Sequence, residues 1–253
     1  MIARSSRRCS TLVAAVTALA LAACGGGSSD GEVLVSAAAS LTDAFEEIEE
    51  AFERTNPDID VIMNLGGSSA LREQILSGAP VDVFASANPE NMEQVAAAEL
   101  LAGDADVFVT NRLQVAVPAG NPAAIEGITD FGNGSLLLGL CAEGVPCGIY
   151  GRKALEKAGI NPTIDTAEPD VRALLNKIEL GELDAGIVYV TDVASTDGGV
   201  EGIDIAESQN AVADYPIATL ADAPNPEAAA RFVAFVLSEE GASILRGFGF
   251  STP

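Results

Sequence analysis

Four short segments of the sequence carry small and polar residues where a predicted strand gives way to a predicted helix. They are residues 37–43, 66–69, 145–150 and 169–172. Backbone N–H groups at the start of a helix have no partner within the helix, and the helix dipole adds a partial positive charge there. Several helix starts that converge on one cleft would therefore bind an anion without a lysine or an arginine.

The residue type that enzymes use most often for acid–base chemistry is missing. The chain contains no histidine, which excludes Ser-His-Asp triads, Cys-His pairs and histidine metal sites. The lysines are Lys153, Lys157 and Lys177, all in segments with the spacing of an amphipathic helix. A hydrolase that acts through Ser40 or Ser68 is a weak alternative, because no partner base is visible. We expect a binding protein and no enzyme.

The N-terminal segment has the pattern of an export signal. Arg4, Arg7 and Arg8 precede an apolar run at residues 12–23, which is short for a membrane span of ~20 residues. We therefore expect residues 1–23 to be a signal peptide that is absent from the mature protein.

The end of this signal resembles a bacterial lipobox, with the sequence Leu-Ala-Ala-Cys at residues 21–24. The resemblance implies cleavage before Cys24 and lipidation of that cysteine, which would anchor the protein to the outer face of the cell membrane. Residues 24–31 are rich in Gly and Ser and would form a flexible tether. An ordinary cleaved signal with a chance cysteine is the alternative.

Net charge argues against nucleic acid as a partner, and the cysteine spacing favours a disulfide. Residues 24–253 keep 10 basic and 37 acidic residues, a formal charge of −27, so nucleic acid is not expected as a partner. Cys141 and Cys147 lie six positions apart, and in an exported protein such a pair is better explained by a disulfide than by a metal or redox site. We expect a monomer.

Short β-rich apolar runs alternate with helical patterns, which predicts an α/β fold with a mostly parallel sheet. Strands are expected at residues 32–37, 60–65, 81–85, 113–117, 136–140, 185–190 and 211–219. Helices are expected at residues 41–52, 68–78, 89–101, 149–158, 171–180, 226–237 and 240–246.

This order of elements fits two similar lobes. Lobe I would comprise residues 32–113 and 217–253, and lobe II residues 114–216. The chain would cross between the lobes near residues 113–118 and 212–218, and a ligand would lie in the cleft between them.

Six motifs, in order, resemble the periplasmic molybdate-binding proteins of bacterial ABC importers. They are AASLT at residues 38–42, GSS at 67–69 with Leu71 and QI at 74–75, GAPVDVFASA at 78–87, VPCGIY at 145–150, DVR at 170–172 and GIVY at 186–189. The resemblance runs from about residue 32 to GFGF at residues 247–250. Each motif alone is weak, but six in this order are specific.

The resemblance implies a type II periplasmic-binding-protein fold whose two lobes close over an oxyanion. Carried over residue by residue, Ser40 and Ser68 would each donate a hydroxyl and their own backbone N–H. Cys147 and Val171 would donate backbone N–H groups, and Tyr189 its phenol O–H. A site of donors without an acceptor suits a deprotonated dianion. The implied ligand is molybdate or tungstate, with no cofactor and no directly coordinated metal, and the implied partner is an ABC permease.

Other interpretations remain open at this point. Sulfate has the same charge and shape as molybdate in a smaller tetrahedron, whereas phosphate would favour a carboxylate acceptor, and ferric iron would favour clustered tyrosines. A purely structural surface lipoprotein is a further alternative. The serines could be plain helix caps, Val171 a core residue and Tyr189 a half-buried strand residue. Asp43 and Asp170 would lie near an anion, so we expect their carboxylates to point away or to cap N–H groups.

Overall fold

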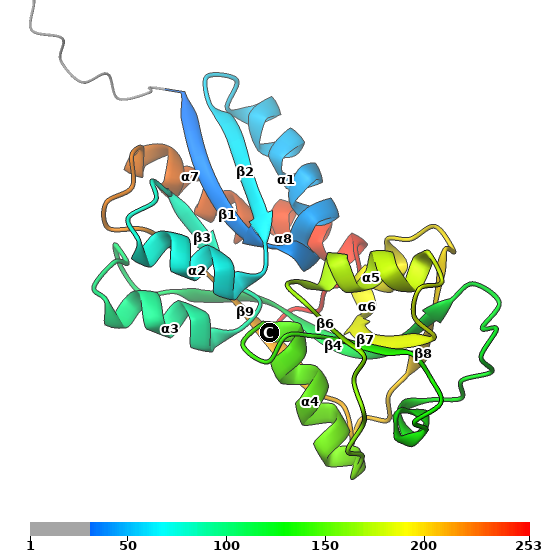
Figure 1. The fold of residues 1–253 in the computed structure, drawn as a ribbon. Helices are drawn as coiled ribbons and strands as arrows, with labels where there is room; N and C mark the ends of the chain where they lie inside the picture. The colour runs from blue at the N-terminus through cyan, green and yellow to red at the C-terminus, as the bar shows by residue number, and fades with distance from the viewer. Residues whose placement is uncertain (1–30) are drawn as a thin grey trace, which may run out of the picture.

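The computed structural model describes residues 31–253. The predicted signal peptide, Cys24 and nearly all of the tether lie outside the described residues. Figure 1 shows two groups of strands and helices, one around β1, β2 and α1 and the other around β7, β8 and α5, with β4 and β9 running between them.

The first group is built on β1 (Glu32–Ala38), which pairs in parallel with β2 (Asp60–Gly66) and β3 (Val83–Ala85). Its helices are α1 (Thr42–Thr55), α2 (Ser68–Leu76), α3 (Pro89–Ala97), α7 (Pro226–Val236) and α8 (Glu239–Gly247). The apolar residues of α1 recur at helical spacing and are buried. Phe52 of α1 packs edge-to-face on Phe232 of α7 with ring centroids 5.4 Å apart, so the two helices share one core.

The second group is built on β5 (Leu138–Cys141), which pairs in parallel with β6 (Thr166–Glu168) and β7 (Ala185–Tyr189). Its helices are α4 (Pro146–Ala158), α5 (Val171–Glu179) and α6 (Val190–Ala194), and a 3₁₀ turn, η2, spans Ile128–Gly132. The buried face of α5 is Val171, Leu174, Leu175 and Ile178. This helix covers β7 and leaves its polar side toward solvent.

One long strand belongs to both groups. β4 (Asp106–Pro118) pairs through residues 106–112 with β9 (Val212–Thr219) and through residues 113–118 with β7 and β8 (Val200–Asp204). The sheet order is therefore β2-β1-β3-β9-β4-β7-β5-β6, with β8 also on β4. The expected crossings near residues 113–118 and 212–218 fall in β4 and β9, and the lobe boundaries themselves stay a prediction.

The sequence prediction of an α/β fold is confirmed, with several local corrections. The strand expected at residues 113–117 begins earlier, at Asp106. The prediction was too short because polar Thr110 and Asn111 interrupt the apolar pattern, although both residues still pair with β9. The strand expected to reach residue 190 ends at Tyr189, where α6 begins. β6, β8 and α6 were not predicted, because each is three to five residues long and carries polar residues among its few apolar ones, whereas the equally short β3, β5 and β7 are buried apolar runs.

Within residues 31–253, no helix has the length and apolar character required to cross a bilayer. The same part of the chain contains no cluster of three or more Cys, Asp and Glu side chains suited to hold a metal ion.

Candidate functional site

The carboxyl ends of the parallel strands meet at a small cavity between the two groups of elements. Its volume is about 10 Å³, room for about one water molecule and far below the ~300–1,000 Å³ of pockets for drug-sized ligands. All five residues singled out in the sequence line it. The lining residues are Ala38, Ala39, Ser40, Gly66, Gly67, Ser68, Ala87, Val145, Pro146, Cys147, Asp170, Val171 and Tyr189.

Four helix starts face this cavity. The 3₁₀ helix η1 (Ala39–Leu41), α2 and α4 each begin without a side-chain hydrogen bond to their first N–H groups. At α5 the carboxylate of Asp170 accepts a hydrogen bond from the N–H of Ala173 at 2.9 Å. The expectation that Asp170 caps N–H groups is thus met. The uncapped starts concentrate free N–H donors and positive dipole ends at one place.

Ser40 and Ser68 are buried and neither is a helix cap, since the cap positions are Ala38 and Gly67. The hydroxyl oxygen of Ser68 accepts a hydrogen bond from the N–H of Ala87 at 3.0 Å. A hydroxyl has one proton and two lone pairs. With one lone pair engaged by Ala87, Ser68 keeps its proton available for an acceptor in the cavity. The plain-cap interpretation of both serines is therefore wrong.

Tyr189 ends β7 with a buried phenol group. Its Oη forms no normal hydrogen bond with any residue in the described part of the chain, although the Tyr215 hydroxyl lies nearby. Burial, followed by the neighbouring Tyr215, raises the pKa of Tyr189 well above its usual value. The phenol therefore stays protonated at neutral pH, and a buried O–H whose polar neighbour, Tyr215, is not in good hydrogen-bond geometry costs free energy. An acceptor that enters the cavity would remove that cost.

A disulfide joins Cys141 to Cys147, with their Cα atoms 5.7 Å apart. It ties the end of β5 to the first turn of α4. The guanidinium of Arg152 donates to the carbonyl oxygens of Cys141 at 2.9 Å and Gly148 at 3.1 Å. The disulfide and the Arg152 contacts together hold the loop that carries the Cys147 N–H.

No lysine or arginine lines the cavity. Arg172 lies behind it, where its guanidinium pairs with Asp43 of α1 and donates to the carbonyl of Ala39 at 3.4 Å and to Ser195 Oγ at 3.0 Å. The carboxylate of Asp43 is thus drawn toward Arg172, as expected for an acid near an anion site. The positive charge of Arg172 is also balanced before any ligand arrives.

Asp192 of α6 is a buried acid that carries no signal in the sequence. One carboxylate oxygen accepts from the N–H of Tyr189 at 2.9 Å, and the other has no hydrogen-bond partner among residues 31–253. Its nearest cation is Arg172, with Nε 4.0 Å from Oδ1. Burial raises the pKa of Asp192 to about 7, although Arg172 and the Tyr189 N–H oppose the shift.

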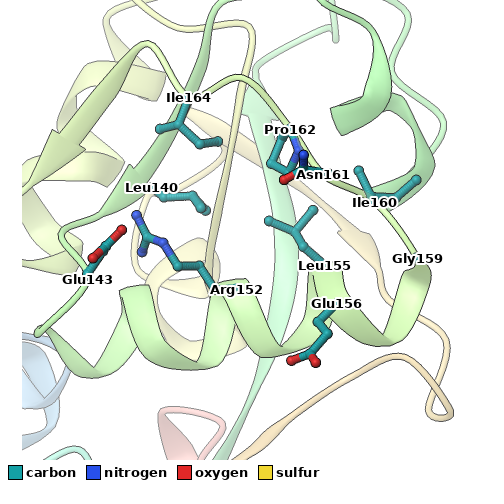
Figure 2. Close-up of a pocket in the computed structure, with 10 residues that line it drawn as sticks. All are labelled: Leu140, Glu143, Arg152, Leu155, Glu156, Gly159, Ile160, Asn161, Pro162 and Ile164. Atoms are coloured by element: carbon teal, nitrogen blue, oxygen red, sulfur yellow. The ribbon is translucent and has the colours of Figure 1, made fainter.

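A larger hollow of about 670 Å³ lies elsewhere, between α4 and the segment that follows it. Figure 2 shows Leu140, Arg152 and Leu155 at this hollow, with Ile164 and Glu143 around it. None of the five predicted residues lines it. Because Arg152 already donates to two backbone carbonyls, the hollow offers an anion only a partly engaged cation beside two carboxylates.

Comparison with known proteins identifies the class. The family model described as bacterial extracellular solute-binding protein matches residues 33–251, and the chain belongs to this family. The molybdate-binding protein ModA of Mycobacterium tuberculosis is 37% identical over 252 residues, which cover 96% of this chain and 97% of that protein. The putative ABC transporter substrate-binding lipoprotein YvgL of Bacillus subtilis is 30% identical over 257 residues, with 97% and 98% covered.

Solved structures confirm the type of fold. The periplasmic molybdate-binding protein of Azotobacter vinelandii superposes with a TM-score of 0.78 at 17% identity, covering 87% of this chain and 99% of that one. The sulfate-binding protein SubI of Mycobacterium tuberculosis gives a TM-score of 0.80 at 16% identity, covering 88% and 87%. Both share the two-lobed periplasmic-binding-protein architecture, and at such identities the likeness concerns the fold alone.

Proposed function

We propose that this chain is the extracytoplasmic solute-binding component of an ABC importer that captures molybdate or tungstate. The observation that carries the proposal is the convergence of Ser40, Ser68, Cys147, Val171 and Tyr189 on one small buried cavity. The ModA name of a relative 37% identical over nearly the whole chain supports the same ligand.

The cavity offers hydrogen-bond donors in every direction. Ser40 and Ser68 would each give a hydroxyl and a backbone N–H, Cys147 and Val171 a backbone N–H each, and Tyr189 its phenol O–H. Hydrogen bonds to a charged oxygen contribute ~1.5–3 kcal/mol each. Because the site excludes water and the donors are fixed by helix starts, little reorganisation is needed when the anion binds.

The protonation state of the ligand decides between tetrahedral anions. Molybdate, tungstate and sulfate are dianions at neutral pH and need only donors. Phosphate carries a proton part of the time and would need an acceptor. The carboxylate that lines the cavity is Asp170, which already caps α5. Sulfate is the second candidate, and the SubI likeness in fold keeps it in the test.

Residues 32–113 with 217–253 would form lobe I and residues 114–216 lobe II, and the two would close over the anion. The permease of the importer would then receive the ligand. The YvgL relative is named a lipoprotein, which supports a lipid on Cys24 and a location on the outer face of the cell membrane. We propose a monomer that transports its ligand without catalysis and without a cofactor.

Calorimetric titration of the exported protein with molybdate, tungstate, sulfate and phosphate tests the proposal. We expect molybdate and tungstate to bind at one site per chain. At 100 times the dissociation constant either ligand should stabilise the fold by ~2.7 kcal/mol. Equal stabilisation by phosphate would contradict a site without acceptors, and tighter binding of sulfate than of molybdate would favour the second candidate.

A further inference from the structure

Tyr215 makes a direct contact with the candidate site without lining it. Its hydroxyl lies 2.8 Å from the hydroxyl oxygen of Ser40, and both groups are buried. The two residues are 175 positions apart in the chain. Tyr215 belongs to β9, where it pairs with Val109 of β4, so this hydroxyl is held by one of the strands that run between the two groups of elements.

The ring of Tyr215 is fixed on two sides. It meets Tyr189 edge-to-face with ring centroids 6.0 Å apart, and it meets Phe250 in the same way at 5.6 Å. A side chain held this way in a close-packed interior does not swing its hydroxyl away from Ser40. Burial also raises the pKa of Tyr215, so its phenol keeps the proton that it can donate.

The direction of the hydrogen bond follows from the ligand. An oxyanion has only acceptor atoms, so Ser40 must turn its single proton toward the ligand in order to bind it. The Ser40 oxygen can then only accept from Tyr215. At Ser68 the equivalent donor is the backbone N–H of Ala87. Both serines thus have a fixed donor behind them, supplied by the main chain in one case and by a side chain in the other.

We infer that Tyr215 is a positioning residue for anion binding, whose phenol O–H orients the Ser40 hydroxyl toward the oxyanion. The inference rests on the proposed function. A chain of two hydrogen bonds that ends on a charged oxygen is strengthened by mutual polarisation. Tyr215→Phe keeps the ring and removes the hydroxyl, with its interactions with Asn111 and Tyr189, after which the Ser40 proton is free to point elsewhere.

Titration of the exported protein with molybdate tests this role. Tyr215→Phe should weaken binding roughly 3- to 10-fold, the loss of about one hydrogen bond. Ser40→Ala should weaken it more, and adding Tyr215→Phe to Ser40→Ala should change the affinity less than twofold. If Tyr215 had a merely structural role, Tyr215→Phe would weaken binding by the same factor in the wild-type protein and in Ser40→Ala. Tyr150→Phe removes the hydroxyl of a buried tyrosine that does not line the cavity, and should weaken binding less than Tyr215→Phe does.

A second measurement does not depend on the folding of Tyr215→Phe. The chain has three tyrosines and no tryptophan, so its near-ultraviolet difference spectrum reports tyrosines without interference. At saturating molybdate, Tyr189→Phe should still show a tyrosine perturbation from Tyr215, and Ser40→Ala with Tyr189→Phe should show none.

Wild-type affinity in Tyr215→Phe, or equal spectral perturbation in the last two variants, would overturn the positioning role alone. Failure of the wild-type protein to bind molybdate would instead overturn the proposed function, and the role of Tyr215 with it.

Discussion

The carbonyl oxygen of Pro169 lies so close to Gly67 that a Cβ atom added to the glycine would be 2.5 Å from it. Gly67 caps α2 in the group built on β1, and Pro169 precedes α5 in the group built on β5. Gly67 has a φ of −63°, which any residue adopts, so the backbone does not require glycine. Glycine is required here by the close approach of the Pro169 carbonyl across the cavity.

Gly67→Ala should therefore impair closure of the site. A side chain forced into this contact costs ~1–3 kcal/mol, which the protein can avoid by staying open. We expect affinity for molybdate to fall roughly 10- to 100-fold, while the melting temperature of the ligand-free protein changes little. Gly103→Ala, where an added Cβ meets nothing within 4 Å, is the matched control. An equal affinity for both variants would show that Gly67 does not limit closure.

Substitutions that remove a side-chain donor should weaken molybdate binding more than substitutions at residues that donate only a backbone N–H. Ser40→Ala, Ser68→Ala and Tyr189→Phe each remove one donor to a charged oxygen, and we expect a roughly tenfold to hundredfold loss of affinity for molybdate. Val171→Ala keeps its N–H and should have a much smaller effect. Calorimetry on each variant provides the measurement.

Two neighbouring positions serve as controls for that series. Ser69→Ala alters the serine next to Ser68, which does not line the cavity, and should bind normally. Arg172→Gln removes a cation that Asp43 already balances, so its effect should also be small. Loss of binding in Arg172→Gln alone, with normal binding in the serine variants, would mean that a salt bridge holds the anion.

The disulfide should matter for stability more than for recognition. Intact-mass analysis with and without reductant should show Cys141 and Cys147 paired in the natively exported protein. Replacing both by Ala opens a short loop and should lower the free energy of unfolding by about 2 kcal/mol. Because the Cys147 donor is a peptide N–H, affinity should change only a few-fold. Two freely alkylated thiols in unreduced protein would contradict the pairing.

Asp192 should make stability depend on pH. Its pKa is about 7 in the folded protein and 3.8 in an unfolded chain, so the folded state alone holds the proton between these limits. This contribution to stability is complete below pH 4 and is lost as the pH rises through 7. Asn resembles the neutral acid, so Asp192→Asn should become relatively more stable than wild type over this range, by up to the order of 4 kcal/mol.

Chemical denaturation of wild type and Asp192→Asn from pH 4 to pH 8 measures that difference. Asp222→Asn, at an exposed position, controls for the loss of one negative charge. A wild-type-minus-variant difference that stays flat across the range would show that Asp192 is ionised throughout.

The five residues predicted from the sequence all line the cavity, and the signals that pointed to them are local. Ser68 and Val171 each begin a helix after a strand or a turn, and the strand order brings such places together. Contacts between distant segments had no local signal. Tyr215 reads as one more inward residue of an alternating strand, and its partner Ser40 lies 175 positions away. The tight approach of Gly67 to Pro169 likewise depends on how the two groups of elements close, which periodicity does not encode.

The helix starts around the cavity also bear on how such a protein can change over generations. Every residue except proline has a backbone N–H. Most substitutions at residues such as Val171 or Cys147 therefore leave that donor in place. The mutational target that can abolish recognition is thus small. A shift in ligand preference is expected to arise instead from substitutions beneath α2, α4 and α5 that move a whole helix end by a fraction of an ångström.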